Sequence, residues 1–136
     1  MKPARWIPIL FALAALYDGV IGCAFLFAPE AVFGWFKVTP PNHPGYIQFP
    51  AGLLLVFALL FAAVARAPAR NRNLIPYGMM LKVCYCGVAG YHWLAAGIPC
   101  MWKPFVVADI VFLVAFGWAW KVLGQAINPP ATRHDP

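Results

Sequence analysis

The sequence predicts an all-α fold, an integral membrane four-helix bundle with both termini in the cytoplasm, and three observations lead to it. Of the 136 residues, 63% are hydrophobic and 10% are charged, whereas about a quarter of the residues of a soluble domain are charged. The apolar residues fall into four long blocks that prolines delimit. Lysine and arginine gather on one side of these blocks.

The four apolar blocks have the length of transmembrane helices. They cover residues 6–28, 47–65, 74–96 and 105–123, each close to the ~20 residues that an α-helix needs to cross a bilayer. One proline stands near the first turn of each block and another follows its end, where proline is compatible with a helix. We therefore expect four continuous helices in a single domain, residues 1–127.

The first outer link is the longest segment between the blocks. Its first half, "PEAVFGWFKV", mixes aromatic residues with Glu30 and Lys37, which predicts a short interfacial helix with Trp35 at the level of the headgroups. An aromatic loop packed on the top of the bundle is the alternative. The polar, proline-rich tail, residues 128–136, is expected to be disordered in the cytoplasm.

Basic residues predict the orientation, because cytoplasmic links carry an excess of lysine and arginine. Seven of the ten lie beside one end of the blocks, Lys37 and Lys103 lie beside the other, and Lys82 lies inside a block. The net charge of +6 reflects this asymmetry. We expect no nucleic-acid partner, because nucleic-acid binding would need a basic face on a folded soluble surface.

A cleaved leader is the alternative for the first block. Lys2 and Arg5 before an apolar run resemble a signal peptide, and "VIGC", ending at Cys23, loosely fits the box before a lipidated cysteine. Cleavage would remove residues 1–22. The apolar run continues past Cys23, however, and a carboxylate inside a leader is unusual, so we expect the block to be retained.

Two of the four acidic residues lie inside apolar blocks. A rise of ~1.5 Å per residue places Asp18 ~18 Å and Lys82 ~12 Å from the inner surface. A charge at this depth costs ~3 kcal/mol on insertion scales, and pairing with an opposite charge lowers that cost. Because a lysine stem spans the remaining difference, the sequence predicts an ion pair between Asp18 and Lys82.

The same count places His92 and Asp109 in the outer half of the bilayer, where we expect a second contact between histidine and carboxylate. Helical spacing puts Tyr85 and Cys86 on the face of Lys82. The expected intramembrane polar site comprises Asp18, Lys82, Tyr85, Cys86, His92 and Asp109. A packing role is the alternative, since polar pairs between membrane helices contribute roughly half a kcal/mol each.

Soft ligands near the outer end raise the question of a metal. Cys23, His92, Cys100 and Met101 together suit copper(I), and Cys23 with Cys100 would also suit a disulfide. Membrane cysteines more often behave as small apolar residues. We therefore expect neither a bound metal nor a cofactor.

Two segments resemble a known family. They are "GVIGCAFLFAPEAVFGWF" at the end of the first block and "FPAGLLLVFALLFA" in the second. A hairpin with a proline after its first helix and a glycine opening its second resembles the DoxX-like group of small bacterial four-helix inner-membrane proteins. The resemblance covers the first half of the chain and the number of spans. It implies the bacterial inner membrane and favours a quinone as ligand, because such families include subunits associated with quinol oxidases.

Three functions are compatible with these features. The first is an accessory or binding subunit whose polar interior holds a lipophilic molecule or a partner helix, in contact with membrane lipids and with a second copy or another membrane protein. The second is a small transporter or conduit for protons or a soft metal ion. A membrane enzyme comes last, because no nucleophile–base, zinc-protease or phosphate-loop motif is present.

The orientation can be tested with reporter fusions at Asn71 and at the C-terminus. Both should report the cytoplasm, because seven of the ten basic residues lie at that end. An outer location for either fusion would contradict the predicted topology. Mass spectrometry of the purified chain provides the control, since loss of residues 1–22 would establish the cleaved form.

Overall fold

The computed structural model describes residues 4–127, and helices joined by short links make up this part of the chain. The helices are α1 (Trp6–Phe27), α2 (Pro29–Phe36), α3 (Gly45–Arg66), α4 (Ile75–Ala95) and α5 (Lys103–Ile127), with 3-10 turns η1 (Arg72–Leu74) and η2 (Cys100–Trp102). Residues 4–127 contain no strand, so the predicted all-α class is confirmed there. The expected disordered tail, residues 128–136, lies outside the described residues, as does Lys2.

Within the described residues, three helices are long and apolar enough to cross a membrane: α1, α3 and α5. Helices of this length and composition are those of a membrane protein. Helix α4 has 21 residues but is less apolar, because Lys82, His92 and three tyrosines interrupt it. Its crossing stays a prediction, as do the four-span bundle and the orientation. The helices follow the predicted blocks, although α3 begins two residues early and α5 continues to Ile127.

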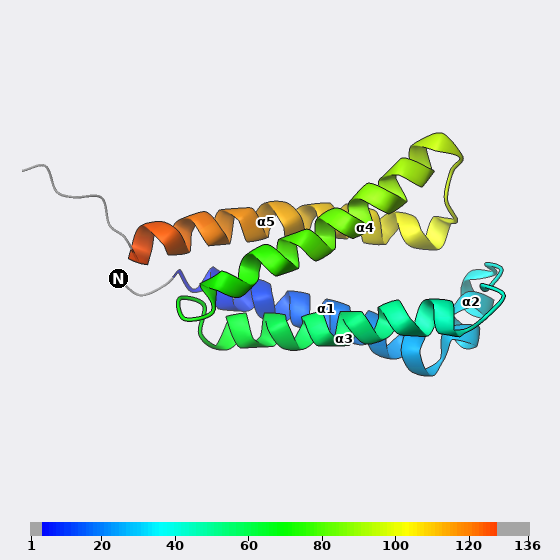
Figure 1. Ribbon diagram of the computed structural model, residues 1–136, viewed down its shortest axis with the longest axis horizontal. Coiled ribbons are helices and arrows are strands. Elements are labelled where there is room, and N and C mark those ends of the chain that lie inside the picture. Colours follow the sequence, from blue (N-terminus) through cyan, green and yellow to red (C-terminus); the bar gives the residue numbers. More distant parts are fainter. Residues whose placement is uncertain (1–3, 128–136) are drawn as a thin grey trace, which may run out of the picture.

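The long helices form two hairpins that separate toward one end (Figure 1). Helix α1 runs beside α3, and α4 packs mainly against α5, whereas α3 and α4 share few contacts. The hairpins lie close together at the end where α1 begins and α5 ends. They diverge toward the end that holds α2 (Figure 1). We call these the inner and the outer end, following the predicted orientation.

Small residues let α1 and α3 pack closely. A Cβ atom at Gly22 would lie 3.0 Å from the backbone oxygen of Ala51 and 2.9 Å from a methyl carbon of Leu55. Gly22 shares a buried face of α1 with Ala14 and Asp18, each four residues apart. Glycine at this position therefore sets the spacing of the first hairpin, by the close approach that small residues permit in membranes.

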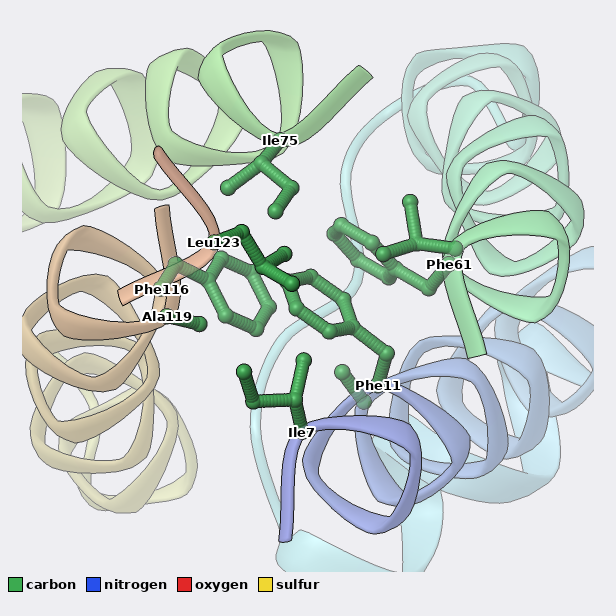
Figure 2. Packing of buried hydrophobic residues seen from close by; sticks show 9 residues of the cluster. Ile7, Phe11, Phe61, Ile75, Phe116, Ala119 and Leu123 are labelled. Atoms are coloured by element: carbon green, nitrogen blue, oxygen red, sulfur yellow. The ribbon is translucent and has the colours of Figure 1, made fainter. Parts of the chain in front are cut away.

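A buried apolar cluster joins all four long helices at the inner end (Figure 2). The rings of Phe11 and Phe116 stack with centroids 4.6 Å apart, and Phe61 lies 5.1 Å from Phe116. We call these three residues the phenylalanine cluster. Because lipid tails are as apolar as phenylalanine, the cluster stabilises the fold by packing rather than by removal from water.

The link between α3 and α4 is tied to α5 at the inner end. The Nε atom of Arg72 donates a hydrogen bond of 2.9 Å to the backbone oxygen of Trp120. The guanidinium carbon of Arg72 also lies 4.2 Å from the centroid of the Trp120 ring, an arrangement in which cation and ring attract one another. The two hairpins are thus joined at this end by both packing and polar contacts.

The short helix expected after the first block is present as α2. Its Phe33 is buried and packs against Phe25 and Trp102, with ring centroids 5.8 and 6.3 Å away. Trp35 points away from this cluster and is 85% exposed. Helix α2 therefore packs on the outer end with one face. The location of Trp35 among the headgroups stays a prediction.

The close approach at Gly22 can be tested by adding a methyl group. Gly22→Ala should lower the thermal midpoint in detergent by several degrees, because the new Cβ meets the backbone of Ala51, which cannot move aside as a side chain can; overpacking costs about 1–3 kcal/mol. Gly87→Ala is the matched control, since nothing lies within 4 Å of a Cβ there. Equal midpoints for the two variants would show that the hairpin tolerates wider spacing.

Candidate intramembrane binding site

The ammonium of Lys82 lies between two carboxylates inside the bundle. Its Nζ atom donates to both oxygens of Asp18, at 2.8 and 3.1 Å. Oδ1 of Asp109 lies 3.0 Å from the same nitrogen. The side chains of Lys82 and Asp18 are 1% exposed and that of Asp109 is 8% exposed. The expected ion pair between Asp18 and Lys82 is thus present, and Asp109 is a second partner. We call the three residues the charged trio.

Local packing places the trio at a junction of the two hairpins. Asp18 projects from α1, Lys82 from α4 and Asp109 from α5. One turn before Lys82, α4 presents Gly78 to the ring of Phe61, and an added Cβ would overlap that ring. The absence of a side chain at Gly78 therefore lets α4 lie directly on α3. This contact holds the base of the lysine side chain close to α1.

Asp109 is in ion-pair contact without being hydrogen bonded. Its Oδ1 atom is buried and has no hydrogen-bond partner among the described residues, although Nζ of Lys82 lies 3.0 Å away. An unsatisfied buried acceptor costs about 1–3 kcal/mol. With both carboxylates ionised the trio carries one more negative charge than positive.

Aromatic rings surround the lysine ammonium. Nζ of Lys82 lies 5.2 Å from the centroid of Tyr17, 5.8 Å from Phe61 and 5.6 Å from Phe112. The negative faces of such rings attract a cation, by about 2 kcal/mol or more where water is excluded. The lysine is therefore held by carboxylates and rings together, which lowers the cost of a charge at this depth.

A cleft of about 520 Å³ opens beside the trio, between the diverging hairpins. Asp18 and Asp109 lie in its lining, which is otherwise almost entirely apolar. Its aromatic wall consists of Tyr17, Phe25, Tyr85, Trp102 and Phe105. The volume falls in the range of small-molecule pockets, ~300–1,000 Å³.

The cleft reaches the outer surface of the helices between α3 and α4. Leu53 of α3 and Val88 of α4 line it and are 43% and 65% exposed. These are apolar side chains on the sides of the helices, where a membrane protein faces lipid. The cleft is therefore open at the apolar sides of α3 and α4. The phenylalanine cluster closes the bundle on the inner side of the trio.

The other predicted site residues occupy less central positions. The hydroxyl of Tyr85 donates to the backbone oxygen of Trp102 at 3.3 Å, and the thiol of Cys86 lies 3.7 Å from the backbone oxygen of Val106. His92 lines the outer part of the cleft and is exposed.

The expected contact between His92 and Asp109 is not formed within residues 4–127, since Asp109 contacts Lys82 instead. His92 follows Lys82 by ten residues, ~15 Å along the helix, and the trio lies too deep for it. The depth count placed Asp109 closer to His92 than to Lys82, and the reach of the lysine stem was applied to Asp18 alone.

The residues considered for a metal do not gather. Cys23 and Cys100 are exposed and free, and Met101 is buried in the cluster of Phe25 and Phe33. Within residues 4–127 no group of three or more histidine, cysteine or acidic side chains is arranged to hold a metal ion. The outer disulfide considered for Cys23 and Cys100 is not formed either.

Comparisons with family models, with curated proteins and with solved structures found no match to this chain. The resemblance to the DoxX-like group therefore stays an expectation from the sequence. The function has to be inferred from the site itself.

Because the trio contains a second carboxylate, variants of Lys82 and Asp18 should differ in stability. Lys82→Met should destabilise the protein more than Asp18→Asn, because it strands two carboxylates, whereas loss of Asp18 leaves the ammonium beside Asp109. Removing one partner of a buried pair costs about 3–5 kcal/mol. Thermal midpoints in detergent measure the difference, and Lys103→Met, which removes a lysine that lies over the Trp93 ring, is the control.

The multiple variants complete this test by a mutant cycle. The double variant Asp18→Asn with Lys82→Met should recover part of the loss, and adding Asp109→Asn should recover more, because no unpaired charge then remains. Strictly additive losses would show that the three side chains do not interact.

Proposed function

We propose that this chain is a membrane protein of four transmembrane helices, α4 included, that binds a lipophilic small molecule in the cleft between its hairpins. It acts as a binding or accessory subunit in the bacterial cytoplasmic membrane, with both termini inside. Its apolar outer surface suits lipid and the helices of a partner, whether a second copy or another membrane protein.

The observation that carries this proposal is the combination of the cleft and the charged trio. The cleft opens toward lipid between Leu53 and Val88, and it ends at the carboxylates of Asp18 and Asp109. Small-molecule sites commonly pair mostly apolar walls with a few polar groups that orient the ligand. A molecule dissolved in the bilayer could enter sideways, place its apolar body along the aromatic wall and direct a polar group to the trio.

A quinone is the ligand class that the resemblance favours, and the cleft offers it suitable walls. The rings of Phe25 and Trp102 stack with centroids 5.6 Å apart, and Phe105 lies 6.2 Å from Trp102. A flat ring can pack against such faces in an offset arrangement. The cleft volume accommodates a ring with the first part of a tail.

A conduit for protons or a soft metal ion is the second candidate, because Asp109 supplies a second buried carboxylate that shares the ammonium of Lys82 with Asp18. The phenylalanine cluster weighs against it, since these packed rings occupy the path from the trio to the inner end. A conduit would need the two hairpins to separate at their most tightly packed end. The arrangement therefore supports binding more strongly than passage.

A membrane enzyme is the third candidate. Lys82 contacts two carboxylates of the cleft lining, but it donates hydrogen bonds to Asp18 as an ammonium. Nucleophilic catalysis by lysine requires the neutral amine. The ion pair thus holds this side chain in its unreactive form.

Binding can be tested with a short-chain ubiquinone and the full chain purified in detergent. The quinone should quench tryptophan fluorescence, because Trp102 lies in the wall of the cleft. Ala89→Phe, which places a ring inside the cleft, should weaken this binding at least tenfold. Val83→Phe is the matched control, since Val83 is exposed on the same helix and does not line the cleft. Equal affinity for Ala89→Phe and the wild type would refute binding at this site.

A further inference from the structure

We infer that the cleft selects lipophilic molecules whose polar head is a protonated amine, with Asp109 as the counter-ion of that head. The inference rests on the proposed function, because it names the ligand chemistry of the same cleft. The chemistry is a primary or secondary ammonium group on an apolar body. A long-chain amine of lipid origin and an amine joined to an aromatic ring through an alkyl chain both supply it.

The first support is the count of charges. Two carboxylates share one ammonium, and Lys82 is the only basic side chain of residues 4–127 in ion-pair contact with Asp109. An excess of one buried charge over its partners is unfavourable in a low-dielectric interior. A bound cation beside Asp109 would bring the site to neutrality.

The second support is the direction of the hydrogen bonds. Lys82 donates to both oxygens of Asp18, whereas Oδ1 of Asp109 lacks a donor among the described residues. A carboxylate needs donors, and a charged donor forms the shorter and stronger bond. An ammonium head supplies donor and charge together. A quinone offers only acceptor oxygens, so it fills the cleft without satisfying Asp109.

The groups around Asp109 show that no neighbour replaces such a ligand. Helix α1 presents Tyr17 and Asp18 to this region, and α4 presents Lys82, Tyr85 and Cys86. The hydroxyl of Tyr85 is already engaged by the backbone oxygen of Trp102. Apart from Lys82, these neighbours carry no positive charge.

The third support is a continuous series of rings from the trio to the outer end. Tyr17 lies 6.3 Å from Phe105, Phe105 lies 6.2 Å from Trp102, and Trp102 stacks on Phe25 at 5.6 Å. Aromatic faces attract organic cations as well as apolar bodies. The Lys82 ammonium, 5.2 Å from the centroid of Tyr17, already shows a cation held in this way.

The decisive experiment compares two ligands of equal length, dodecylammonium and dodecanol, on the full chain in detergent. The alcohol offers a hydrogen-bond donor without a charge, so the comparison isolates the charge. Competition against the quenching by short-chain ubiquinone measures both affinities. We expect dodecylammonium to bind at least tenfold more tightly than dodecanol. Equal affinities for the two would overturn the inference.

Variants assign this preference to one carboxylate. Asp109→Asn should remove the preference for the amine while dodecanol still binds, and Glu30→Gln, which neutralises an exposed carboxylate on α2, should leave it unchanged. An amine preference that survives in Asp109→Asn would overturn the inference. Should that variant fail to fold, Asp109→Glu keeps the charge and must keep the preference, and loss of it there would count against the inference.

The two proposals fail in different ways. If neutral and charged ligands bind equally, the cleft is a binding site without the inferred selectivity, and only the amine inference is wrong. If the quinone, the alcohol and the amine all fail to bind, both proposals are wrong. Amine binding that Ala89→Phe leaves unchanged would place the amine outside the cleft and would also overturn the inference.

Discussion

The arrangement of the two hairpins depends on one interaction, the ion pairing of the Lys82 ammonium with the carboxylates of Asp18 and Asp109. A charge in hydrocarbon must be paired, and the partners here come from both hairpins, since α1 carries Asp18 and α5 carries Asp109. Pairing therefore fixes α4 against α1 and α5 at one depth. On the inner side of this point the helices are packed by phenylalanine rings. On the outer side they diverge around the cleft.

The composition of the trio bears on whether it serves packing or binding. One carboxylate is enough to neutralise Lys82, and Asp18 already accepts two hydrogen bonds from it. Asp109 adds a negative charge that packing does not require. Its Oδ1 atom is also a buried acceptor without a hydrogen-bond donor among residues 4–127. Polar groups in excess of structural need, beside a cleft that is open toward lipid, are typical of a site rather than of a packing device.

Local patterns of the sequence predict much of this architecture. The length of the apolar blocks and the placement of prolines predicted the helices, and helical spacing together with depth predicted the contact between Asp18 and Lys82. The second partner, Asp109, was missed because helix depth alone places it near His92, whereas the flexible lysine stem determines the actual contact. The cleft could not be predicted, because it arises from the angle between the hairpins. That angle depends on tertiary packing, such as that of Gly78 on Phe61.

The polar character of α4 has a consequence for biogenesis. Of the four long helices it is the one whose composition alone falls short of that of a membrane span, and Lys82 is its one charged lysine or arginine side chain. Translation delivers the hairpin of α1 and α3 first, so Asp18 is already present when α4 leaves the ribosome. In the proposed topology α4 would enter the bilayer against an existing counter-charge rather than against lipid alone. The order of the segments along the chain thus lets the earlier hairpin act as a template for insertion of the later one.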